Sequence, residues 1–536
     1  GQFCPFRLWR LPALFLHTTQ HNIKKMRYGY FLLFLLFSAP ALFAQSWELS
    51  PENIDRALRD AAETTNADPF RPAFHLTPPA GCMGDPNGGI YHEGWFHIFY
   101  GLQPFAHHPG GWYWAHARSK DLLHWEPMKT GLTPALELGL DAIGSGSTII
   151  TENGTKLAFY SQGQNGQGMK FWRAEFTNEQ LSAWTHEGKN PILTLDHPNL
   201  PPFDGFWRDP FVFRVQGRTF LIACADLFEE NYVPVPLFEA KDKELTDWEY
   251  KGNLFTVPKH KYRNLEVPEF RPIDDKWLFM ASTDAPVDRV NYFLGEFDLE
   301  NLKFNVESEG VIDHSGHYYA QETIVDDKGH VYLMSWIPGW DREWLPYYMN
   351  QPLKNSNPVW NGCFAIPRRL RLKDGRILQS PVAALKDLRA NPFRLGPKLL
   401  PVSGPVTAVE VIDGCRGDQM EIRAQFELHN ASFCGINVLS DEAGLGGLPI
   451  VWSGNVLNVD GVKVPVEEWQ QGDAIDLHLF IDKKVVEIFV NGGRYCISRQ
   501  VREEHVKDQH IALTALGGTA QLISFEAWEL SGVNGD

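Results

Sequence analysis

Three acidic residues stand in short motifs whose residue types suit sugar chemistry. Asp85 lies in "CMGDPNGG", Asp209 in "FWRDPFVF" and Glu266 in "NLEVPEF". Cleavage of a glycosidic bond requires one carboxyl group that attacks or stabilises the cation-like sugar and another that protonates the leaving oxygen. A third carboxylate can hold sugar hydroxyls as positive charge develops. The set predicts a glycosidase, provided that the fold brings the three residues together.

Each of these residues also has a simpler interpretation. Asp-Pro often opens a turn, so Asp85 or Asp209 taken alone is more simply a turn residue. Glu269 lies three residues after Glu266, and spacing alone does not separate them as the acid. We expect Arg208 to keep the adjacent Asp209 ionised and a polar setting to keep Asp85 ionised, whereas the acid needs a raised pKa.

The elements around the motifs are predicted to be short strands. From about residue 73, alternating apolar runs such as "GGIYHEGWFHIFY" and "PFVFRVQGRTFLIACA" are separated by turn residues. Within them "EGW" and "VQGRT" predict tight hairpin turns. These patterns predict an all-β chain.

A long-period repeat organises these strands. A Leu three residues before a Trp recurs at Trp125, Trp184 and Trp248, and a weaker echo reaches Phe304. The intervals of about 60 residues each hold about four strands, which is typical of propeller blades. The stretch from roughly 75 to 395 has room for five such units.

The flanking segments differ from the repeat. "SPENIDRALRDAAET" predicts a helix with Ser50 as its cap, and beyond the Pro-rich link near 392–405 the alternating strands predict a β-sandwich. The predicted organisation is an upstream extension (1–25), a signal peptide (26–44), a helical lead-in (45–72), a five-bladed β-propeller (73–395) and a β-sandwich (396–536).

Composition narrows the partners and the compartment. Residues 26–44 follow a basic pair and combine a short apolar run with a small residue at its end, which predicts a signal peptide and a secreted or periplasmic protein. The formal net charge of −17 excludes nucleic acid and anionic membranes as partners, because a polyanion would be repelled. The apolar run is too short and Pro-broken for stable membrane insertion.

Tryptophan usage bears on the kind of ligand, and cysteine usage bears on disulfides and metal sites. The 18 Trp suit an oligo- or polysaccharide ligand, because indole faces stack on sugar C–H surfaces, although any single Trp is more simply a core residue. The seven Cys are scattered without a CxxC or Cys/His pairing, which predicts neither a disulfide framework nor a zinc site. No metal or other cofactor is predicted.

The motifs together resemble those of glycoside hydrolase family 32, the β-fructofuranosidases, over roughly residues 73–535. "CMGDPNG" is similar to the family's Trp-Met-Asn-Asp-Pro-Asn-Gly, "FYGLQP" to Phe-Tyr-Gln-Tyr-Asn-Pro and "GSGS" to Phe-Ser-Gly-Ser. The Arg-Asp-Pro motif is intact, and "EVPEF", "YAQET", "WNGCFAIPRRLRL" and "VEIFVNGG" resemble later motifs in the same order.

The resemblance implies an all-β fold, a five-bladed β-propeller followed by a β-sandwich. It implies that Asp85 is the nucleophile, Asp209 the transition-state stabiliser and Glu266, in preference to Glu269, the general acid/base of a retaining, metal-free mechanism. Residues implied to contact the sugar are Arg208, Ser145, Gly84, Gly101 and, as a wall, Trp336.

The departures from the family's motifs fall in the same places. Cys82 and Gly84 stand where the family has Trp and Asn, and Gly101 stands where it has Gln. Gly144 replaces a Phe and Val267 a Cys. Losing amide and aromatic side chains removes hydrogen bonds and opens space, which changes discrimination between substrates. The catalytic carboxylates are kept, which favours altered recognition over lost activity.

The leading hypothesis is an exported hydrolase that cleaves β-fructofuranosidic bonds in fructans or sucrose-type sugars. One alternative is a furanosidase or fructosyltransferase with a shifted substrate. Another, from a different class, is a non-catalytic carbohydrate-binding propeller. The intact carboxylates argue against that class, because a binding protein gains little from keeping an acid.

Overall fold

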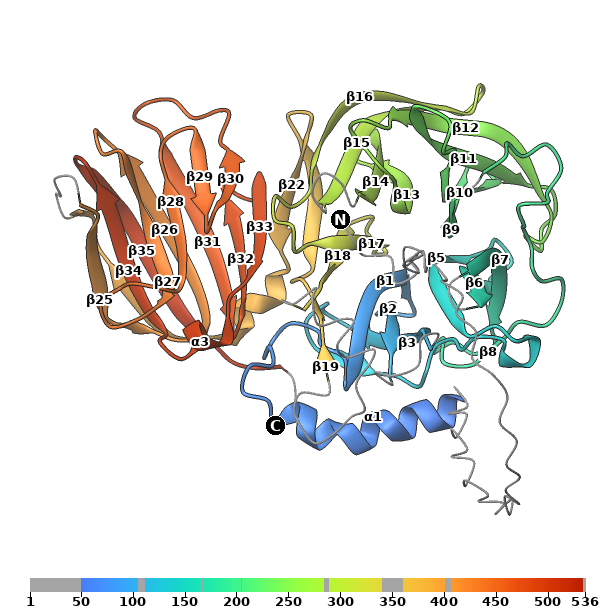
Figure 1. Ribbon diagram of the computed structural model, residues 1–536, viewed down its shortest axis with the longest axis horizontal. Coiled ribbons are helices and arrows are strands. Elements are labelled where there is room, and N and C mark those ends of the chain that lie inside the picture. The colour runs from blue at the N-terminus through green and yellow to red at the C-terminus, as the bar shows by residue number, and fades with distance from the viewer. Residues whose placement is uncertain are drawn as a thin grey trace, which may run out of the picture.

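The computed structural model describes residues 50–104, 111–164, 167–203, 205–283, 289–339, 360–400 and 406–533. Within them the chain is almost entirely β-structure, apart from helix α1 (Pro51–Asn66), the short α3 (Glu503–Val506) and two 3-10 turns (Figure 1). The predicted upstream extension and signal peptide lie outside the described residues. No helix in the described part combines the length and the hydropathy that crossing a membrane requires.

Helix α1 confirms the helix predicted for residues 50–64 and extends it to Asn66. The hydroxyl of Ser50 accepts a hydrogen bond from the Asn53 N–H at 3.3 Å, and Pro51 occupies the start of the helix. The helix buries Ile54 completely and lies beneath the first strands of the chain (Figure 1).

Five mainly antiparallel sheets follow one another between residues 81 and 381, each built on four principal strands. The first strand of each sheet contacts the first strand of the next, and β17 contacts β1, so these strands form a closed ring. The parallel strand β19 (Trp360–Asn361), from the end of this region, pairs with β1.

The strands of the five sheets have the following bounds. They are β1 (Gly81–His92), β2 (Trp95–Gln103), β3 (Tyr113–Ser119), β4 (Trp125–Pro127); β5 (Ala142–Ile150), β6 (Lys156–Gln164), β7 (Gln167–Phe176), β8 (Trp184–Thr185); β9 (Gly205–Val215), β10 (Arg218–Asp226), β11 (Tyr232–Ala240), β12 (Trp248–Pro258); β13 (Glu266–Ile273), β14 (Lys276–Thr283), β15 (Arg289–Asp298), β16 (Lys303–Val311); and β17 (Tyr319–Val325), β18 (Val331–Ile337), β20 (Cys363–Phe364), β21 (Arg368–Lys373), β22 (Arg376–Pro381).

The Leu-x-x-Trp repeat marks the entry into the fourth strand of a sheet. Its three Trp residues are the first residues of β4, β8 and β12, and the echo at Phe304 is the second residue of β16. In each motif a Leu with left-handed backbone occupies the preceding turn: Leu122, Leu181 and Leu245 in the Trp motifs and Leu302 in the echo. The three Leu residues of the Trp motifs are also buried. Burial of an apolar side chain offsets a backbone conformation that L-residues rarely adopt.

Two further sheets pack face to face over residues 389–530 and enclose a separate apolar core. One contains β23 (Arg389–Leu395), β24 (Lys398–Leu399), β26 (Gln419–Leu428), β31 (Ala474–Asp482), β32 (Val485–Val490), β33 (Tyr495–Gln500) and β35 (Ala520–Leu530). The other contains β25 (Ala408–Arg416), β27 (Phe433–Ser440), β28 (Leu448–Trp452), β29 (Val456–Val459), β30 (Val462–Pro465) and β34 (His510–Leu516).

Strand β23 lies on the other side of the domain boundary drawn from the sequence. It pairs with β35, so residues 389–395 belong with the C-terminal sheets, whereas the sequence placed them in the propeller. The Pro-rich segment predicted the boundary too late in the chain. Pro392 lies at a register shift within an edge strand, which is one of the positions in a sheet that tolerate Pro.

A buried ionic network joins the two sheet systems. The Arg368 guanidinium, from β21, donates to Asp313 at 2.9 Å and to Glu487 of β32 at 2.6 Å. His75, which precedes β1, contacts Glu487 at 3.0 Å and Asp482 at 2.7 Å. Burial alone would lower the pKa of His75, but the two carboxylates raise it to about 9, so the imidazole stays charged at neutral pH.

We predict that Arg368→Met destabilises the protein by about 3–5 kcal/mol, because it leaves two carboxylates buried without their shared cation. The loss is measured as a fall in unfolding free energy in urea. Arg394→Met is the matched control, since Arg394 pairs with Glu526 on the surface and such a pair contributes about 0–1 kcal/mol. Equal effects of the two substitutions would contradict the role of the network.

Candidate active site

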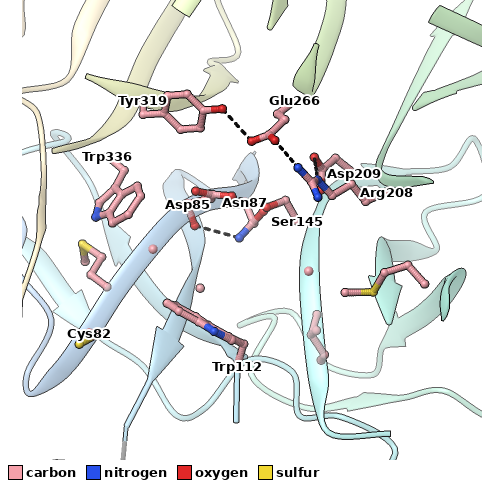
Figure 2. Close-up of a pocket in the computed structure, with 16 residues that line it drawn as sticks. Cys82, Asp85, Asn87, Trp112, Ser145, Arg208, Asp209, Glu266, Tyr319 and Trp336 are labelled. Atoms are coloured by element: carbon pink, nitrogen blue, oxygen red, sulfur yellow. Dashed lines mark hydrogen bonds and ion pairs between the residues drawn. The ribbon is translucent and has the colours of Figure 1, made fainter. Parts of the chain in front are cut away.

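One pocket opens where the first strands of the five sheets meet, and all eight residues predicted from the sequence line it (Figure 2). Its walls come from β1, β5, β9, β13 and β17, with further residues from β2, β7, β18 and the segment before β3. The lining residues are Cys82, Met83, Gly84, Asp85, Asn87, Gly101, Trp112, Ile143, Gly144, Ser145, Met169, Arg208, Asp209, Glu266, Tyr319 and Trp336.

Register shifts place the polar side chains in the pocket. β1 loses its regular pairing with β2 around Asp85, β5 with β6 around Ser145, and β13 with β14 just after Glu266. The pairing of β9 with β10 is likewise shifted at Asp209, and the pairing of β17 with β18 is shifted just after Tyr319. A bulge re-aims a side chain out of the plane of its sheet, which explains why five sheets contribute polar groups to one point.

Asp85 is held by the neighbouring sheet. The Ser145 hydroxyl donates to its Oδ2 at 2.7 Å, while Asn87 bonds both the Asp85 carbonyl (2.9 Å) and the Gly146 N–H (3.1 Å). Burial raises the pKa of Asp85 to about 6, with Glu266 adding to the rise and Ser145 and Arg208 opposing it. The setting is less polar than the sequence suggested, but Asp85 is still mainly ionised at neutral pH.

Asp209 differs from the sequence-based expectation in its ionisation. Its Oδ2 accepts from the Val267 N–H at 3.1 Å and lies 3.5 Å from the Arg208 Nε. Burial nevertheless raises the pKa of Asp209 to about 7, since it outweighs Arg208 and is reinforced by Glu266 and Asp85. The expectation that Arg208 keeps Asp209 ionised at neutral pH is therefore wrong, because the effect of burial outweighs that of the guanidinium.

Glu266 receives the largest number of hydrogen bonds among the three carboxylates. Its Oε1 accepts from Arg208 and from Asn264 Nδ2 (2.7 Å), and its Oε2 accepts from the Tyr319 hydroxyl at 2.7 Å (Figure 2). Sequence reasoning missed Asn264 and Tyr319 as partners. Tyr319 is the first residue of the motif "YAQET", so the sequence did contain a pattern that could have identified it. The contact of Asn264 instead depends on the local bend of the chain before β13.

Glu269, the competing acid, does not line the pocket. It is buried and accepts from the Thr323 N–H (2.7 Å) and hydroxyl (2.8 Å), which ties β13 to β17. The backbone at Val267, between the two glutamates, has a φ of 49°, and the resulting bulge turns Glu266 and Glu269 to different surroundings. Of the two glutamates that spacing could not distinguish as the candidate acid, only Glu266 therefore reaches the pocket.

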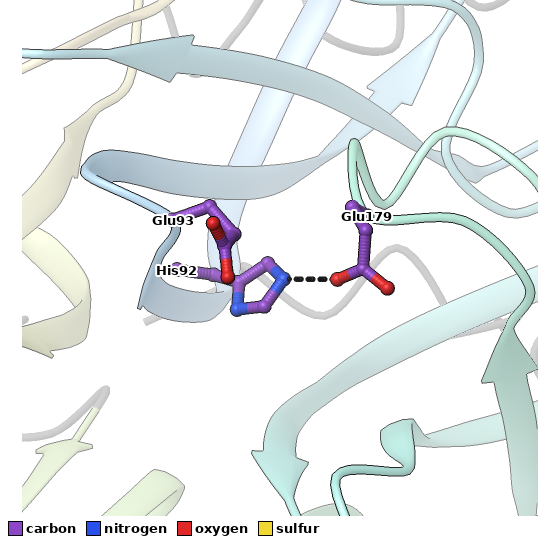
Figure 3. Close-up of side chains that lie close together, drawn as sticks. All are labelled: His92, Glu93 and Glu179. Atoms are coloured by element: carbon purple, nitrogen blue, oxygen red, sulfur yellow. Dashed lines mark hydrogen bonds and ion pairs between the residues drawn. The ribbon is translucent and has the colours of Figure 1, made fainter.

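A second cluster of metal-ligating groups lies away from this pocket, at the β1–β2 turn. Ligand atoms of His92, Glu93 and Glu179 lie within 4.8 Å of one another (Figure 3). Lys156 already contacts Glu179 at 2.8 Å, and both glutamates are exposed. Surface ion pairing accounts for the arrangement, and we assign it no ligand. The six cysteines of the described residues are free thiols.

The chain matches two family models. That of the "Glycosyl hydrolases family 32 N-terminal domain" covers residues 75–381, and that of the "Glycosyl hydrolases family 32 C terminal" covers residues 404–529.

Curated relatives include the sucrose-6-phosphate hydrolase of Bacillus subtilis (strain 168), 25% identical over 81% of this chain and 89% of its own length. The levanase of the same organism is 27% identical over 82% of this chain and 67% of its own length.

Solved structures share the fold. Fructan 1-exohydrolase IIa from Cichorium intybus superposes with a TM-score of 0.73 at 20% identity, covering 87% of this chain and 98% of its own. The Bombyx mori family 32 β-fructofuranosidase BmSUC1 superposes with a TM-score of 0.70 at 21% identity, covering 90% and 98%. At these identities the structures establish the architecture alone.

The raised pKa of Asp85 predicts a stability change that depends on pH. The pKa of Asp85 is about 6 in the folded protein against an ordinary 3.8, so ionisation of this carboxyl opposes folding. The resulting loss of unfolding free energy grows as the pH rises from 3.8 to about 6 and is complete above that pH. We expect Asp85→Asn to raise the melting temperature at pH 8, by the equivalent of up to about 3 kcal/mol, and to have little effect near pH 4.

Calorimetry at the two pH values measures this difference. Ser145→Ala is the opposite control, because it removes the hydrogen bond to the carboxylate and should lower the melting temperature at pH 8. Stabilisation by Asp85→Asn that is equal at both pH values would show that charge burial is not the cause.

Proposed function

Because the chain belongs to glycosyl hydrolase family 32, we propose that it hydrolyses β-fructofuranosidic bonds in fructans or sucrose-type sugars, with retention of configuration. The observation that carries the proposal is the convergence of Asp85, Asp209 and Glu266, from three different sheets, on one pocket. The relatives include a levanase and a sucrose-6-phosphate hydrolase, which supports the same class of substrate.

In the first step the Asp85 carboxylate attacks the anomeric carbon of the fructosyl unit. The bond from that carbon to the leaving oxygen breaks while Glu266 gives its proton to the oxygen, and a fructosyl ester forms on Asp85. The Ser145 hydroxyl fixes one oxygen of Asp85, and Tyr319 fixes the carboxyl of Glu266. Both groups therefore start the reaction in defined orientations.

In the second step Glu266 acts as a base. It takes a proton from water, whose oxygen attacks the same carbon, and the ester bond breaks to restore the Asp85 carboxylate. Asp209 holds sugar hydroxyls near the developing charge. Arg208, which contacts both Glu266 and Asp209, limits the repulsion among the three carboxylates throughout.

We further propose that the five sheets of residues 81–381 are the blades of a five-bladed β-propeller with the pocket at one end of its axis. The closed ring of first strands supports this arrangement, as does the pairing of β19 with β1. The two C-terminal sheets then form the β-sandwich. A propeller accounts for the contribution of catalytic groups by successive sheets.

A hydrolysis panel with sucrose, inulin, levan and arabinan tests the function. We expect fructose from at least one fructoside, with β-fructofuranose as the first anomer seen by NMR, and no turnover by Asp85→Asn despite its retained fold. Transfer of fructose to sugar instead of water would favour the transferase alternative, and binding without cleavage would favour a carbohydrate-binding protein. Turnover by Asp85→Asn at the wild-type rate would refute the assignment.

The two glutamates of β13 provide a matched pair of variants. Glu266→Gln should lower kcat by about 10²–10⁴-fold, because an amide can neither donate the acid's proton nor accept one from water. Glu269→Gln should keep kcat near the wild-type value, because Glu269 lies outside the pocket and bonds Thr323. Initial rates on the best substrate of the panel measure both, and the reverse pattern would exchange the roles.

A further inference from the structure

The indole of Trp112 covers the backbone at two glycines of the pocket. A Cβ on Gly84 would lie 2.9 Å from the ring's Cζ3, and a Cβ on Gly101 would lie 3.5 Å from its Cε3. Figure 2 shows the ring across the pocket from Glu266, on the far side of Asp85. The absence of a side chain at Gly84 is therefore what lets the ring lie against the floor beside the nucleophile, whereas a Cβ at Gly101 would make only an ordinary contact with the ring.

The backbone of Trp112 is anchored to the neighbouring sheet. Its carbonyl accepts from the Ile143 N–H at 3.0 Å, and an isolated parallel bridge joins Trp112 to Ala142. The ring consequently has a fixed place between the first and second sheets, whose β1 and β5 carry Asp85 and Ser145.

The wall that Trp112 forms is apolar except for one donor. Ile143 and Met169 also line this pocket, and Gly101 contributes no side chain. The indole N–H of Trp112 is buried and makes no hydrogen bond to any residue of the described ranges. A buried donor without an acceptor is costly, so the arrangement favours a ligand that brings an oxygen to this N–H.

We propose that Trp112 determines substrate specificity: it stacks on the C–H face of the sugar bound at Asp85 and donates its N–H to one oxygen of that sugar. The inference rests on the proposed function and specifies its donor sugar. The wall accepts a furanose that presents carbon atoms and a single acceptor to the ring. A sugar with several hydroxyls on that face would leave them buried and unpaired, and the site would reject it.

Two substitutions of Trp112 distinguish the contribution of stacking from that of the N–H donor. Trp112→Phe keeps an aromatic face and loses the N–H, so KM should rise about twofold to tenfold with kcat nearly unchanged. Trp112→Ala removes the face as well, and KM should rise about tenfold or more. It should also narrow the difference in kcat/KM between fructosides and arabinan.

Two glycine variants move the ring without changing it. Gly84→Ala places a Cβ within 3.0 Å of the ring and must displace it, whereas Gly101→Ala makes an ordinary contact, so KM should rise more for Gly84→Ala. Trp184→Phe, in the outer strand β8, is the control for a Trp exchange outside the pocket. Circular dichroism and melting temperature report folding for every variant.

Calorimetric titration with fructose supplies a readout that does not require turnover. If fructose binding weakens in Trp112→Phe and Trp112→Ala while no fructoside is hydrolysed, the proposed function fails and the role of Trp112 stands. If fructosides are hydrolysed but KM and the fructose Kd are unchanged in both variants, the role of Trp112 is overturned and the function stands. If wild-type protein neither binds fructose nor cleaves any sugar of the panel, both are overturned.

Discussion

Three carboxylates share one guanidinium at the centre of this protein. Arg208 contacts Glu266 and Asp209 directly and lowers the pKa of Asp85 from further away, and it is the single cation among the described residues that line the pocket. One positive charge cannot neutralise three buried negative ones, so burial raises the pKa of Asp85 and of Asp209. Burial around a single guanidinium therefore moves the pKa values of Asp85 and Asp209 toward neutral pH.

The surrounding fold must hold this unfavourable group of charges in place. Asp209, Val267 and Ala320, in three consecutive first strands, have backbone φ values of 58°, 49° and 49°. Such conformations persist only where the neighbouring structure over-determines them. Here each first strand is paired within its sheet and packed against its neighbours in the ring, and the buried Arg368 network fixes the fifth sheet to the C-terminal domain.

The parts of this arrangement that depend on local sequence were predictable. Turn chemistry placed the β1–β2 hairpin, where Glu93 and Gly94 have the left-handed conformation that such turns require. The Leu-x-x-Trp period predicted units of about four strands, because each of the three Trp motifs has a buried Leu in the same kind of turn. Long-range features were not predictable in this way. The pKa of Asp209 depends on Glu266 and Asp85, which meet it only after the ring closes, and β23 crosses the expected boundary because its partner β35 lies more than a hundred residues away.

In the proposed function, reaction and recognition occupy different walls of the pocket. The carboxylates are held by bulges in β1, β9 and β13 and by hydrogen bonds that run between those strands and their neighbours. The apolar wall comes from Trp112, whose position is set by Ile143 and by the lack of a side chain at Gly84. No residue of that wall hydrogen-bonds Asp85, Asp209 or Glu266 through its side chain in the described structure. Substitutions on the recognition wall can therefore change which sugar is accepted while the bond-breaking groups keep their geometry, and the departures at residues 84 and 101 from the family's motifs follow that division.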